Sequence, residues 1–212
     1  MLPKVPNARD FSVLLASASP RRRQLLRAAG IHFEAVASNI PEMKEEGETP
    51  EEFAQRIAVQ KAEQVRASRP AEQRPIVAAD TVVVVDEQVL GKPASASEAA
   101  AMLRRLSGRS HRVITGLCVL DPLSGRRLVQ AVVTVVRFAP LTEEEVREYV
   151  ASGEPRDKAG AYAIQGLASR FVKSIEGCYF NVVGLPVPTL YGMLKQFRRG
   201  KRQPPQRCDE SL

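Results

Sequence analysis

Apolar residues are distributed along this chain in two patterns, one typical of strands and the other of helices. Strands are predicted where apolar residues run together or alternate with polar ones, over residues 13–16, 31–36, 76–85, 112–120, 128–138 and 171–175. Helices are predicted where apolar residues recur every three or four positions, over residues 20–29, 50–65, 97–107, 142–150 and 188–197. Capping residues support two helix starts, because Ser19-Pro20 and Thr49-Pro50 each place a hydroxyl group before a first-turn proline.

The order of these segments predicts the fold class. Strands and helices alternate except at one hairpin, in which two strands flank the turn at residues 121–125. This interruption favours an α/β fold with an elongated mixed β-sheet flanked by helices over a purely parallel sheet. Residues 76–85 are apolar at nearly every position, so we expect a central strand that is covered on both faces.

Composition and charge indicate one domain with a basic end. Of the 212 residues, 44% are hydrophobic and 26% are charged, which is ordinary for a globular protein and excludes wholesale disorder. No linker rich in Pro or Gly divides the chain, so we predict a domain over residues 11–197 between an N-terminal extension (1–10) and a basic, disordered tail (198–212). The tail holds much of the net charge of +7, and the weakly basic remainder argues against a nucleic-acid-binding protein.

The sequence contains no signal for membrane insertion or export. No apolar run approaches the ~20 residues of a membrane-spanning helix, and residues 1–11 lack the apolar core of a secretory signal. The three cysteines, Cys118, Cys178 and Cys208, are far apart and form neither a metal-binding spacing nor a disulfide framework. We therefore expect a cytoplasmic protein without a membrane partner.

The first candidate site is the run Ser17-Ala18-Ser19-Pro20-Arg21-Arg22-Arg23, where a predicted strand leads into a helix. The free N–H groups of a helix N-terminus attract anions, and arginine can hold two phosphate oxygens at once. Three arginines in a first turn oppose the helix dipole, so a negatively charged ligand such as a polyphosphate would compensate them. Taken alone, the run is also consistent with a basic surface turn that pairs with nearby carboxylates.

Two further candidates are an aspartate and a lysine in constrained backbone. Asp80 lies inside the apolar strand at residues 76–85, where a carboxylate is costly unless it is paired or binds a metal. A rigid strand also suits a general base or a metal ligand, although at a strand end Asp80 would only meet solvent. Lys92 lies between Gly91 and Pro93 without a preceding P-loop pattern, and a lysine fixed in this way can neutralise phosphate charge.

The glycine-containing segment at residues 152–166 is a candidate for ligand recognition. Its glycines let a backbone approach a ligand closely, and Gln165 offers both a donor and an acceptor, as recognition of a nucleotide base requires. A solvated surface loop is the alternative interpretation.

The remaining residue types indicate water as the nucleophile. The two histidines, His32 and His111, lie near no serine or cysteine that suggests a catalytic triad. We therefore expect a water molecule that is activated by a carboxylate and a divalent metal. Asp80 and Glu42 are the candidate ligands, since Mg²⁺ typically binds one or two carboxylates together with substrate phosphates.

Six ordered motifs resemble those of the Maf family of nucleoside triphosphate pyrophosphatases, from about Leu14 to Leu194. They are L-A-S-A-S-P-R-R at 15–22, A-A-D-T at 78–81, G-K-P at 91–93, L-S-G-R-S-H at 106–111, S-G-E-P-R-D-K-A-G-A-Y-A-I-Q-G at 152–166 and N-V-V-G-L-P at 181–186. The resemblance implies cleavage of a nucleoside triphosphate between its α- and β-phosphates, which yields the monophosphate and pyrophosphate. It also implies a sheet that spans two lobes with a central cleft, and a homodimer.

The resemblance further implies a role for individual residues. Asp80 corresponds to the proton acceptor that activates the attacking water, and Glu42 to an acidic residue near the metal, Mg²⁺ or Mn²⁺. The polar and cationic phosphate contacts correspond to Ser17, Arg21, Arg22, Lys61 and Lys92. Without the resemblance, Lys61 would be interpreted as a solvated helix residue.

Within the family, this sequence resembles the branch that acts on dTTP, UTP and related modified pyrimidine nucleotides. Arg21, Thr81 and Gln165 match that branch, whereas the branch acting on 7-methyl-GTP typically carries a tryptophan that this chain lacks. Ala163 and Gly91 depart from the pyrimidine pattern, which usually has Gly and often has Glu there. Two alternatives stay open: a 7-methyl-GTP pyrophosphatase, and a non-enzymatic basic protein that binds nucleic acid or a division partner.

Overall fold

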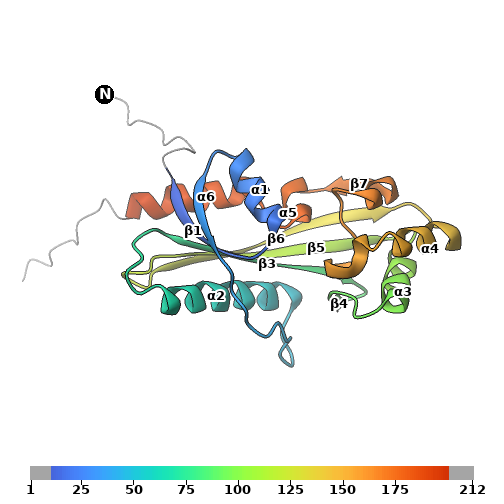
Figure 1. Ribbon diagram of the computed structural model, residues 1–212, viewed down its shortest axis with the longest axis horizontal. Coiled ribbons are helices and arrows are strands. Elements are labelled where there is room, and N and C mark those ends of the chain that lie inside the picture. The colour runs from blue at the N-terminus through green and yellow to red at the C-terminus, as the bar shows by residue number, and fades with distance from the viewer. Residues whose placement is uncertain (1–10, 201–212) are drawn as a thin grey trace, which may run out of the picture.

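The structure, a computed structural model, describes residues 11–200 (Figure 1). Within this range the strands are β1 (Ser12–Ala16), β2 (His32–Val36), β3 (Ile76–Val85), β4 (Gln88–Leu90), β5 (Ser110–Leu120), β6 (Arg127–Phe138) and β7 (Val172–Glu176). The α-helices are α1 (Pro20–Ala28), α2 (Pro50–Ser68), α3 (Ala96–Leu106), α4 (Glu143–Ala151), α5 (Tyr179–Val183) and α6 (Val187–Gly200). Short 3₁₀ helices, η2 (Glu154–Asp157), η3 (Ala159–Ala161) and η4 (Leu167–Phe171), lie between α4 and β7.

The strands between residues 11 and 200 form one mixed sheet of seven strands. The order is β2-β1-β3-β5-β6-β7, and β4 pairs with part of β3. β1 is parallel to β2 and β3, whereas every other pair is antiparallel. The long strands β3, β5 and β6 run along the molecule and make it elongated (Figure 1). The predicted α/β fold with a mixed sheet is therefore confirmed.

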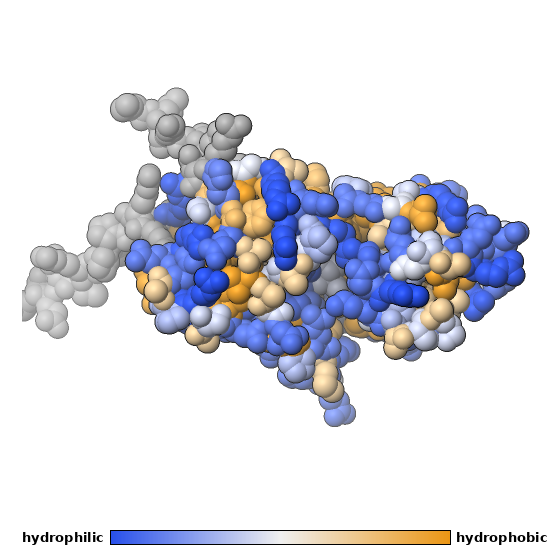
Figure 2. All heavy atoms as spheres, in the orientation of Figure 1, coloured by the Kyte–Doolittle hydropathy of each residue, from blue (hydrophilic) through white to orange (hydrophobic). Residues whose placement is uncertain are grey.

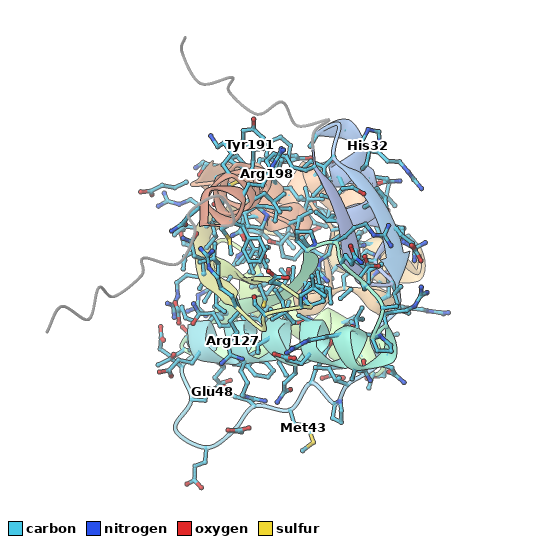
Figure 3. All side chains as sticks on the ribbon, turned by 90° about the vertical axis from the view of Figure 1, so that its left-hand side faces the viewer. His32, Met43, Glu48, Arg127, Tyr191 and Arg198 are labelled. Atoms are coloured by element: carbon cyan, nitrogen blue, oxygen red, sulfur yellow. The ribbon has the colours of Figure 1, made fainter. Side chains whose placement is uncertain are left out.

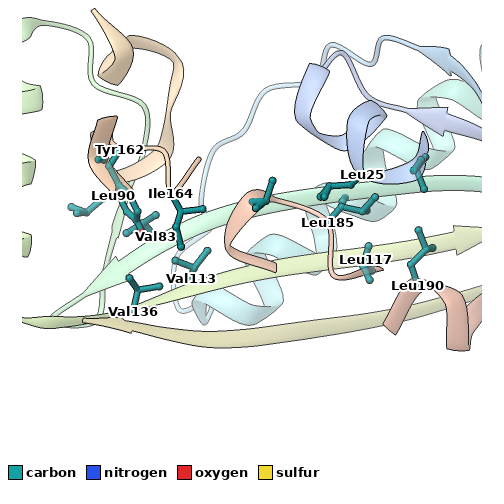
Figure 4. Packing of buried hydrophobic residues seen from close by; sticks show 14 of the residues in the cluster. Leu25, Val83, Leu90, Val113, Leu117, Val136, Tyr162, Ile164, Leu185 and Leu190 are labelled. Carbon is teal, nitrogen blue, oxygen red and sulfur yellow. The ribbon is translucent and has the colours of Figure 1, made fainter. Parts of the chain in front are cut away.

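β3 is the central strand that the sequence predicts, and its alternate residues serve two hydrophobic layers. Val77, Ala79 and Val83 belong to the large cluster that α1, α3, α5 and α6 cover, part of which is drawn in Figure 4. Ala78 and Val82 face α2 in two smaller clusters on the other side of the sheet. α2 thus lies on one side of the sheet, with α1, α5 and α6 on the other (Figure 1).

One strand and one α-helix, like the three short 3₁₀ helices, have no counterpart among the predicted segments. β4 follows a two-residue turn in which Asp86 and Glu87 adopt φ of 50° and 57°, and such a turn is normally marked by Asn or Gly. α5 has five residues, too few for a helical repeat of apolar positions. Residues 160–164 are buried, so the segment at 152–166 is not a solvated surface loop.

The predicted terminal segments lie mostly outside the described residues. α6 continues to Gly200, so residues 198–200 extend the last helix, and the remainder of the predicted tail falls at 201–212. The predicted N-terminal extension, residues 1–10, also lies outside the described range. Every helix within residues 11–200 is too short or too polar for a transmembrane segment.

One edge of β3 has a gap in its strand pairing. β1 pairs with β3 only as far as Val77, and β4 pairs with it only from Val83 onward. Residues 78–82 have no partner strand on this edge, while β5 pairs with the opposite edge throughout. The gap leaves Asp80 and Thr81 accessible from one side of a strand that is otherwise enclosed.

The chain leaving β1 and the chain leaving β4 both enter this gap. Extending the parallel β1–β3 register brings Ser17 level with Ala79. Extending the antiparallel β3–β4 register brings Lys92 level with Thr81. Two segments that are 75 residues apart in the sequence therefore converge on the same few residues of β3.

α2 approaches the sheet closely at Gly116 of β5. A Cβ atom at this position would lie 2.2 Å from the carbonyl oxygen of Ala54 and 2.5 Å from the backbone nitrogen of Gln55. Only glycine permits this contact, because neither backbone atom can move without displacing the helix. The close approach brings the side chains of α2, Lys61 among them, near the gap in the edge of β3.

Candidate active site

A pocket of about 410 Å³ lies at the gap in the edge of β3. Its walls come from the β1–α1 turn, the loop after β2, α2, β3, Lys92 and residues 157–165 and 182–184. All nine residues selected from the sequence line it: Ser17, Arg21, Arg22, Glu42, Lys61, Asp80, Thr81, Lys92 and Gln165. In Figure 2, hydrophilic residues surround a hollow near the middle of the visible face.

Hydroxyl groups hold the turn between β1 and α1. Ser19 caps α1, and its side chain accepts a hydrogen bond of 3.4 Å from the N–H of Arg22. The buried Ser17 accepts from the N–H of Ser19 at 3.1 Å and from Nη1 of Arg22 at 3.3 Å. The first turn of α1 contains Pro20 and no acidic residue, so the positive end of the helix dipole is not neutralised within that turn.

Arg22 connects three walls of the pocket. Besides Ser17, its guanidinium donates to the carbonyl oxygen of Gly184 at 2.8 Å and to Oγ1 of Thr81 at 3.1 Å. Burial lowers the pKa of Arg22, while the negative charges of Asp80 and Glu42 act in the opposite direction. Because arginine starts from so high a pKa, the side chain remains a cation at neutral pH.

Lys61 lies between the two candidate acidic residues. Its Nζ donates to Oδ1 of Asp80 and to Oε1 of Glu42, each at 2.6 Å. Lys61 and Asp80 are only 7% and 5% exposed, so each charge depends on the other for compensation. Burial acts to raise the pKa of Glu42, but the hydrogen bond from Lys61 and the charges of Lys61, Lys92 and Arg22 lower it overall. Glu42 is therefore ionised at neutral pH.

The loop that carries Glu42, residues 37–49, is fastened to α2 by a side-chain amide. Gln64 accepts a hydrogen bond of 2.8 Å from the N–H of Asn39 and donates one of 3.0 Å to the carbonyl oxygen of the same residue. These two hydrogen bonds engage the N–H and the carbonyl group of Asn39 together, as a neighbouring β-strand would. It fixes the backbone three residues before Glu42, at a position that also lines the pocket.

A second attachment holds the same loop after Glu42. Arg56 of α2 donates to the carbonyl oxygen of Met43 at 2.8 Å and to the carboxylate of Glu48 at 2.7 and 2.8 Å. Figure 3 shows the Met43 side chain pointing to solvent below α2, with Glu48 on the same loop. Glu42 thus lies between two points at which α2 binds the loop, although the loop has no regular structure of its own.

The wall at residues 157–165 carries Gln165. The N–H of Gly160 donates to the carbonyl oxygen of Gly91 at 3.0 Å, which joins this wall to the segment of Lys92. Ala163 is buried in the wall and Gln165 is exposed at the pocket. Of the two departures from the pyrimidine pattern, Ala163 therefore lies in this wall and Gly91 lies beside it, and a Cβ atom at Gly91 would meet no atom within 4 Å.

The acidic residues of the pocket form a small oxygen donor set. Among residues 11–200, no group of three or more His, Cys, Asp or Glu residues is arranged to hold a metal ion. Asp80 and Glu42 present two carboxylates that contact the same ammonium group. Such a set fits Mg²⁺ or Mn²⁺, which can take its other ligands from water and substrate phosphates.

A buried polar network that the sequence did not predict lies behind Thr81. Oγ1 of Thr81 lies 2.9 Å from Oγ1 of Thr115, directly opposite on β5. Thr115 donates to the carbonyl oxygen of Asn181 at 3.3 Å, and the Asn181 amide donates to Oγ1 of Thr134 at 2.9 Å. The N-V-V-G-L-P motif at 181–186 was the available signal, because it marks the segment that supplies Asn181 and the carbonyl group bound by Arg22.

Comparison with known proteins assigns the chain to a family. The family model described as Maf-like protein matches residues 12–197. The chain belongs to the Maf family. This Maf chain is 51% identical over 183 residues to a dTTP/UTP pyrophosphatase from Syntrophotalea carbinolica, covering 86% of this chain and 83% of the relative.

Further relatives of this Maf protein carry the same description. A dTTP/UTP pyrophosphatase from Syntrophomonas wolfei is 51% identical, covering 88% of this chain and 96% of the relative. One from Geobacter sulfurreducens is 52% identical, covering 82% of this chain and 91% of the relative. Among solved structures, protein VC0702 from Vibrio cholerae has a TM-score of 0.48 and 13% identity, over 92% of this chain and 99% of that one.

Proposed function

We propose that this Maf protein hydrolyses dTTP and UTP, and related modified pyrimidine nucleotides, to the monophosphate and pyrophosphate. The relatives from Syntrophotalea, Syntrophomonas and Geobacter are named dTTP/UTP pyrophosphatase. The observation that carries the proposal is a single pocket in which the buried carboxylate of Asp80 lies among several cations. A nucleoside triphosphate needs both, because its negative charge has to be neutralised while water is activated.

The β1–α1 turn is proposed to bind the phosphates. Arg21 and Arg22 offer guanidinium groups at the N-terminus of α1, where backbone N–H groups and the helix dipole also favour anions. Lys92 approaches from the opposite end of the gap and adds a third cation. Ser17 already orients Arg22 through its hydroxyl group, so the turn is arranged before the substrate binds.

Asp80 is proposed to accept the proton of the attacking water. The water oxygen forms a bond to the α-phosphorus. The bond from that phosphorus to the oxygen that bridges the α- and β-phosphates breaks, and pyrophosphate leaves with the electron pair of the broken bond. The proton passes to the carboxylate of Asp80, which the central strand β3 holds in place. Lys61, at 2.6 Å, orients this carboxylate and balances its charge.

Asp80 and Glu42 are also the residues that would hold the divalent cation, Mg²⁺ or Mn²⁺. When bound, such a cation supplies positive charge to the phosphate oxygens. Glu42 suits this role because its carboxylate is ionised at neutral pH and partly exposed to the pocket.

Gln165 is proposed to recognise the base. Its amide offers a donor and an acceptor at the pocket, and both uracil and thymine present a matching acceptor and donor. Val83, Val113 and Ile164 line the same pocket and provide apolar surface for a ring. The base would therefore lie at the wall formed by residues 157–165.

A panel of nucleotides tests the proposed function. Pyrophosphate release is measured with dTTP, UTP, dCTP, dATP, dGTP and 7-methyl-GTP, each with Mg²⁺, with Mn²⁺ and with neither. We expect the highest kcat/KM for dTTP and UTP, and activity only with a divalent metal. Fastest hydrolysis of 7-methyl-GTP would assign the chain to the other branch, and no hydrolysis of any nucleotide would favour the non-enzymatic alternative.

Replacement of Asp80 tests its role in the reaction. Asp80→Asn keeps the shape of the side chain but removes the basic oxygen, so we expect kcat to fall at least about a hundredfold with circular dichroism unchanged. Asp86→Asn is the matched control, because Asp86 is exposed on the β3–β4 turn. A near-normal kcat in Asp80→Asn would remove Asp80 from the proton transfer.

We also infer from the family resemblance that the chain forms a homodimer and acts in the cytoplasm. Light scattering of the purified protein measures the mass in solution, and a mass equal to that of one chain would contradict the dimer. Fractionation of cells that express a tagged chain measures the location.

A further inference from the structure

His111 is a buried histidine that the proposed function does not use. It lies near the start of β5, is 2% exposed, and ends the L-S-G-R-S-H motif at residues 106–111. Its Nε2 lies 2.8 Å from the hydroxyl oxygen of Tyr162. Its Nδ1 is buried without a hydrogen-bond partner among the described residues. Within residues 11–200, the imidazole therefore makes its side-chain hydrogen bond to Tyr162 alone.

The surroundings of this hydrogen bond are aromatic. The rings of His111 and Tyr162 each pack edge to face with Phe138, at centroid distances of 5.0 and 4.8 Å. In such a setting a hydrogen bond is strengthened, and an unpaired polar atom is costly. Ring packing alone would tolerate small shifts of the Tyr162 side chain. The hydrogen bond to His111 fixes its position, because any shift would leave both polar groups unpaired.

The backbone just before Tyr162 is in an unfavourable conformation. Gly160 and Ala161 have φ of 67° and 59°, so two consecutive residues are left-handed. For an alanine this conformation costs about 1–2 kcal/mol, and Ala161 is fully buried. Such a bend persists only where contacts on both sides hold it.

Contacts on both sides of the bend are present. Before it, Gly160 donates to the carbonyl oxygen of Gly91, and a Cβ at Gly160 would lie 2.8 Å from Cγ1 of Val83. After it, Tyr162 lies beside Val83 (Figure 4) and is bound by His111. The bend turns the chain so that the three residues following Tyr162 line the pocket and end at Gln165.

We propose that His111 is a positioning residue that, through Tyr162, fixes the wall at residues 160–165 and with it the orientation of Gln165 toward the nucleotide base. The proposal rests on the proposed function, because Gln165 is the residue assigned to base recognition there. Asp80 and Lys61 are held by β3 and α2, in contacts that do not involve this wall. The pair His111–Tyr162 therefore acts on nucleotide selection and KM more than on kcat.

Tyr162→Phe tests the proposal with the smallest change, since it removes one hydroxyl group and keeps the ring. We expect KM for dTTP and UTP to rise about tenfold, which corresponds to about 1.4 kcal/mol of binding. kcat should change much less, and the ranking of nucleotides should shift in the same direction as in Gln165→Ala. Amide hydrogen exchange across residues 160–165 should become faster, because the wall opens more often.

Two substitutions of His111 separate its hydrogen bond from its volume. His111→Gln places an amide nitrogen near the position of Nε2 and should restore most of the wild-type KM and nucleotide ranking. His111→Leu fills the space without a polar atom and should behave like Tyr162→Phe. Equal defects in His111→Gln and His111→Leu would overturn the proposal.

Ile76→Val is the control for a general loss of stability, because it removes one buried methyl group from the distant start of β3. It should lower Tm without altering KM or the nucleotide ranking. If Tyr162→Phe likewise lowers Tm but leaves KM and the nucleotide ranking unchanged, the hydrogen bond is only structural and the proposal is wrong. Failure of the proposed function can be distinguished from failure of this proposal, because the wild-type chain would then hydrolyse no nucleotide. Hydrogen exchange would still decide whether His111 orders the wall at residues 160–165.

Discussion

Asp80 and Thr81 are adjacent in the sequence but face opposite sides of the sheet. Side chains alternate along a strand, so Asp80 faces α2 and reaches Lys61, whereas Thr81 faces the other layer and contacts Arg22. At the gap in the edge of β3, both side chains nevertheless border one pocket. A slip of β3 by a single residue would exchange their faces, so the site depends on the strand register.

Protonation of His111 is expected to destabilise the fold. Burial lowers the pKa of His111 to about 4, from 6.5 in an exposed histidine. Between these values the unfolded chain binds a proton that the folded chain does not, so stability is retained above pH 6.5 and falls toward pH 4 by up to about 1.4 kcal/mol per pH unit. The neighbouring Tyr162 and Phe138 carry no negative charge that could compensate the imidazolium.

Urea unfolding at several pH values between 7 and 4 measures this effect. Carboxylates also titrate in the lower part of the range, so the comparison is between the wild-type chain and His111→Gln. We expect the free energy of unfolding of the variant to depend less steeply on pH above about 5. Identical slopes would contradict the assignment of the pH dependence to His111.

At the scale of elements, α2 contributes to the site in two ways. Its inner face passes close to β5 at Gly116 and carries Lys61 into the pocket. Its outer face holds the loop at residues 37–49 through Gln64 and Arg56. A carboxylate on an irregular loop can be positioned only if a rigid element supports the loop on each side.

Gln64→Ala is expected to weaken metal binding without removing a ligand. Loss of both hydrogen bonds to Asn39 frees the loop before Glu42, and such supporting contacts typically change metal affinity about tenfold. Binding of Mn²⁺ to the protein alone, followed by electron paramagnetic resonance, measures this directly. Gln60→Ala, at an exposed position on the same helix, is the control and should leave Mn²⁺ affinity unchanged.

Gly116→Ala is expected to separate α2 from the sheet. The added Cβ would lie 2.2 Å from the carbonyl oxygen of Ala54, so the free energy of unfolding should fall by about 1–3 kcal/mol or more. kcat should fall with it, because Lys61 moves away from Asp80. Gly192→Ala on α6 is the matched control: its Cβ would meet no atom within 4 Å, and it should stabilise the chain by about 0.5–1 kcal/mol.

At the scale of the whole molecule, the pocket lies where two halves of the elongated sheet meet. The β1–α1 turn and the loop of Glu42 come from one half, and Lys92 and residues 157–165 come from the other. β3 passes through both halves. The phosphate contacts of the β1–α1 turn and the base-recognition wall are therefore attached to opposite ends of one continuous strand, and Lys92 reaches the phosphates from the end that carries the wall.

Deletion of residues 201–212 tests whether the positive charge near the end of the sequence serves the reaction. The deletion leaves α6 intact, including Arg198, whose guanidinium lies over the ring of Phe11 at 5.3 Å. No pocket residue is removed, so we expect kcat/KM to stay within about twofold. A large loss of activity, or nucleic-acid binding that disappears with the deletion, would favour the alternative of a basic binding protein.

The fold could be predicted from local patterns wherever those patterns were long. Apolar runs and capping residues indicated β3, α1 and α2 with nearly their observed bounds. β4 and α5 were missed because three and five residues are too few to show a repeat. The burial of residues 160–164 was also hidden, since small residues such as Gly160 and Ala161 carry no clear hydrophobic signal.

Sequence alone determined the periodicity of the elements, the α/β class and, through the ordered motifs, which side chains to consider for a site. Only the tertiary structure decided how they meet: that β1 and β4 leave a gap along β3, that Lys61 bridges Asp80 and Glu42, and that His111 binds Tyr162. The two side-chain contacts of Lys61 and that of His111 join residues 19 to 51 positions apart. Strand register and helix packing bring such residues together, and neither is encoded in the local pattern around any one of them.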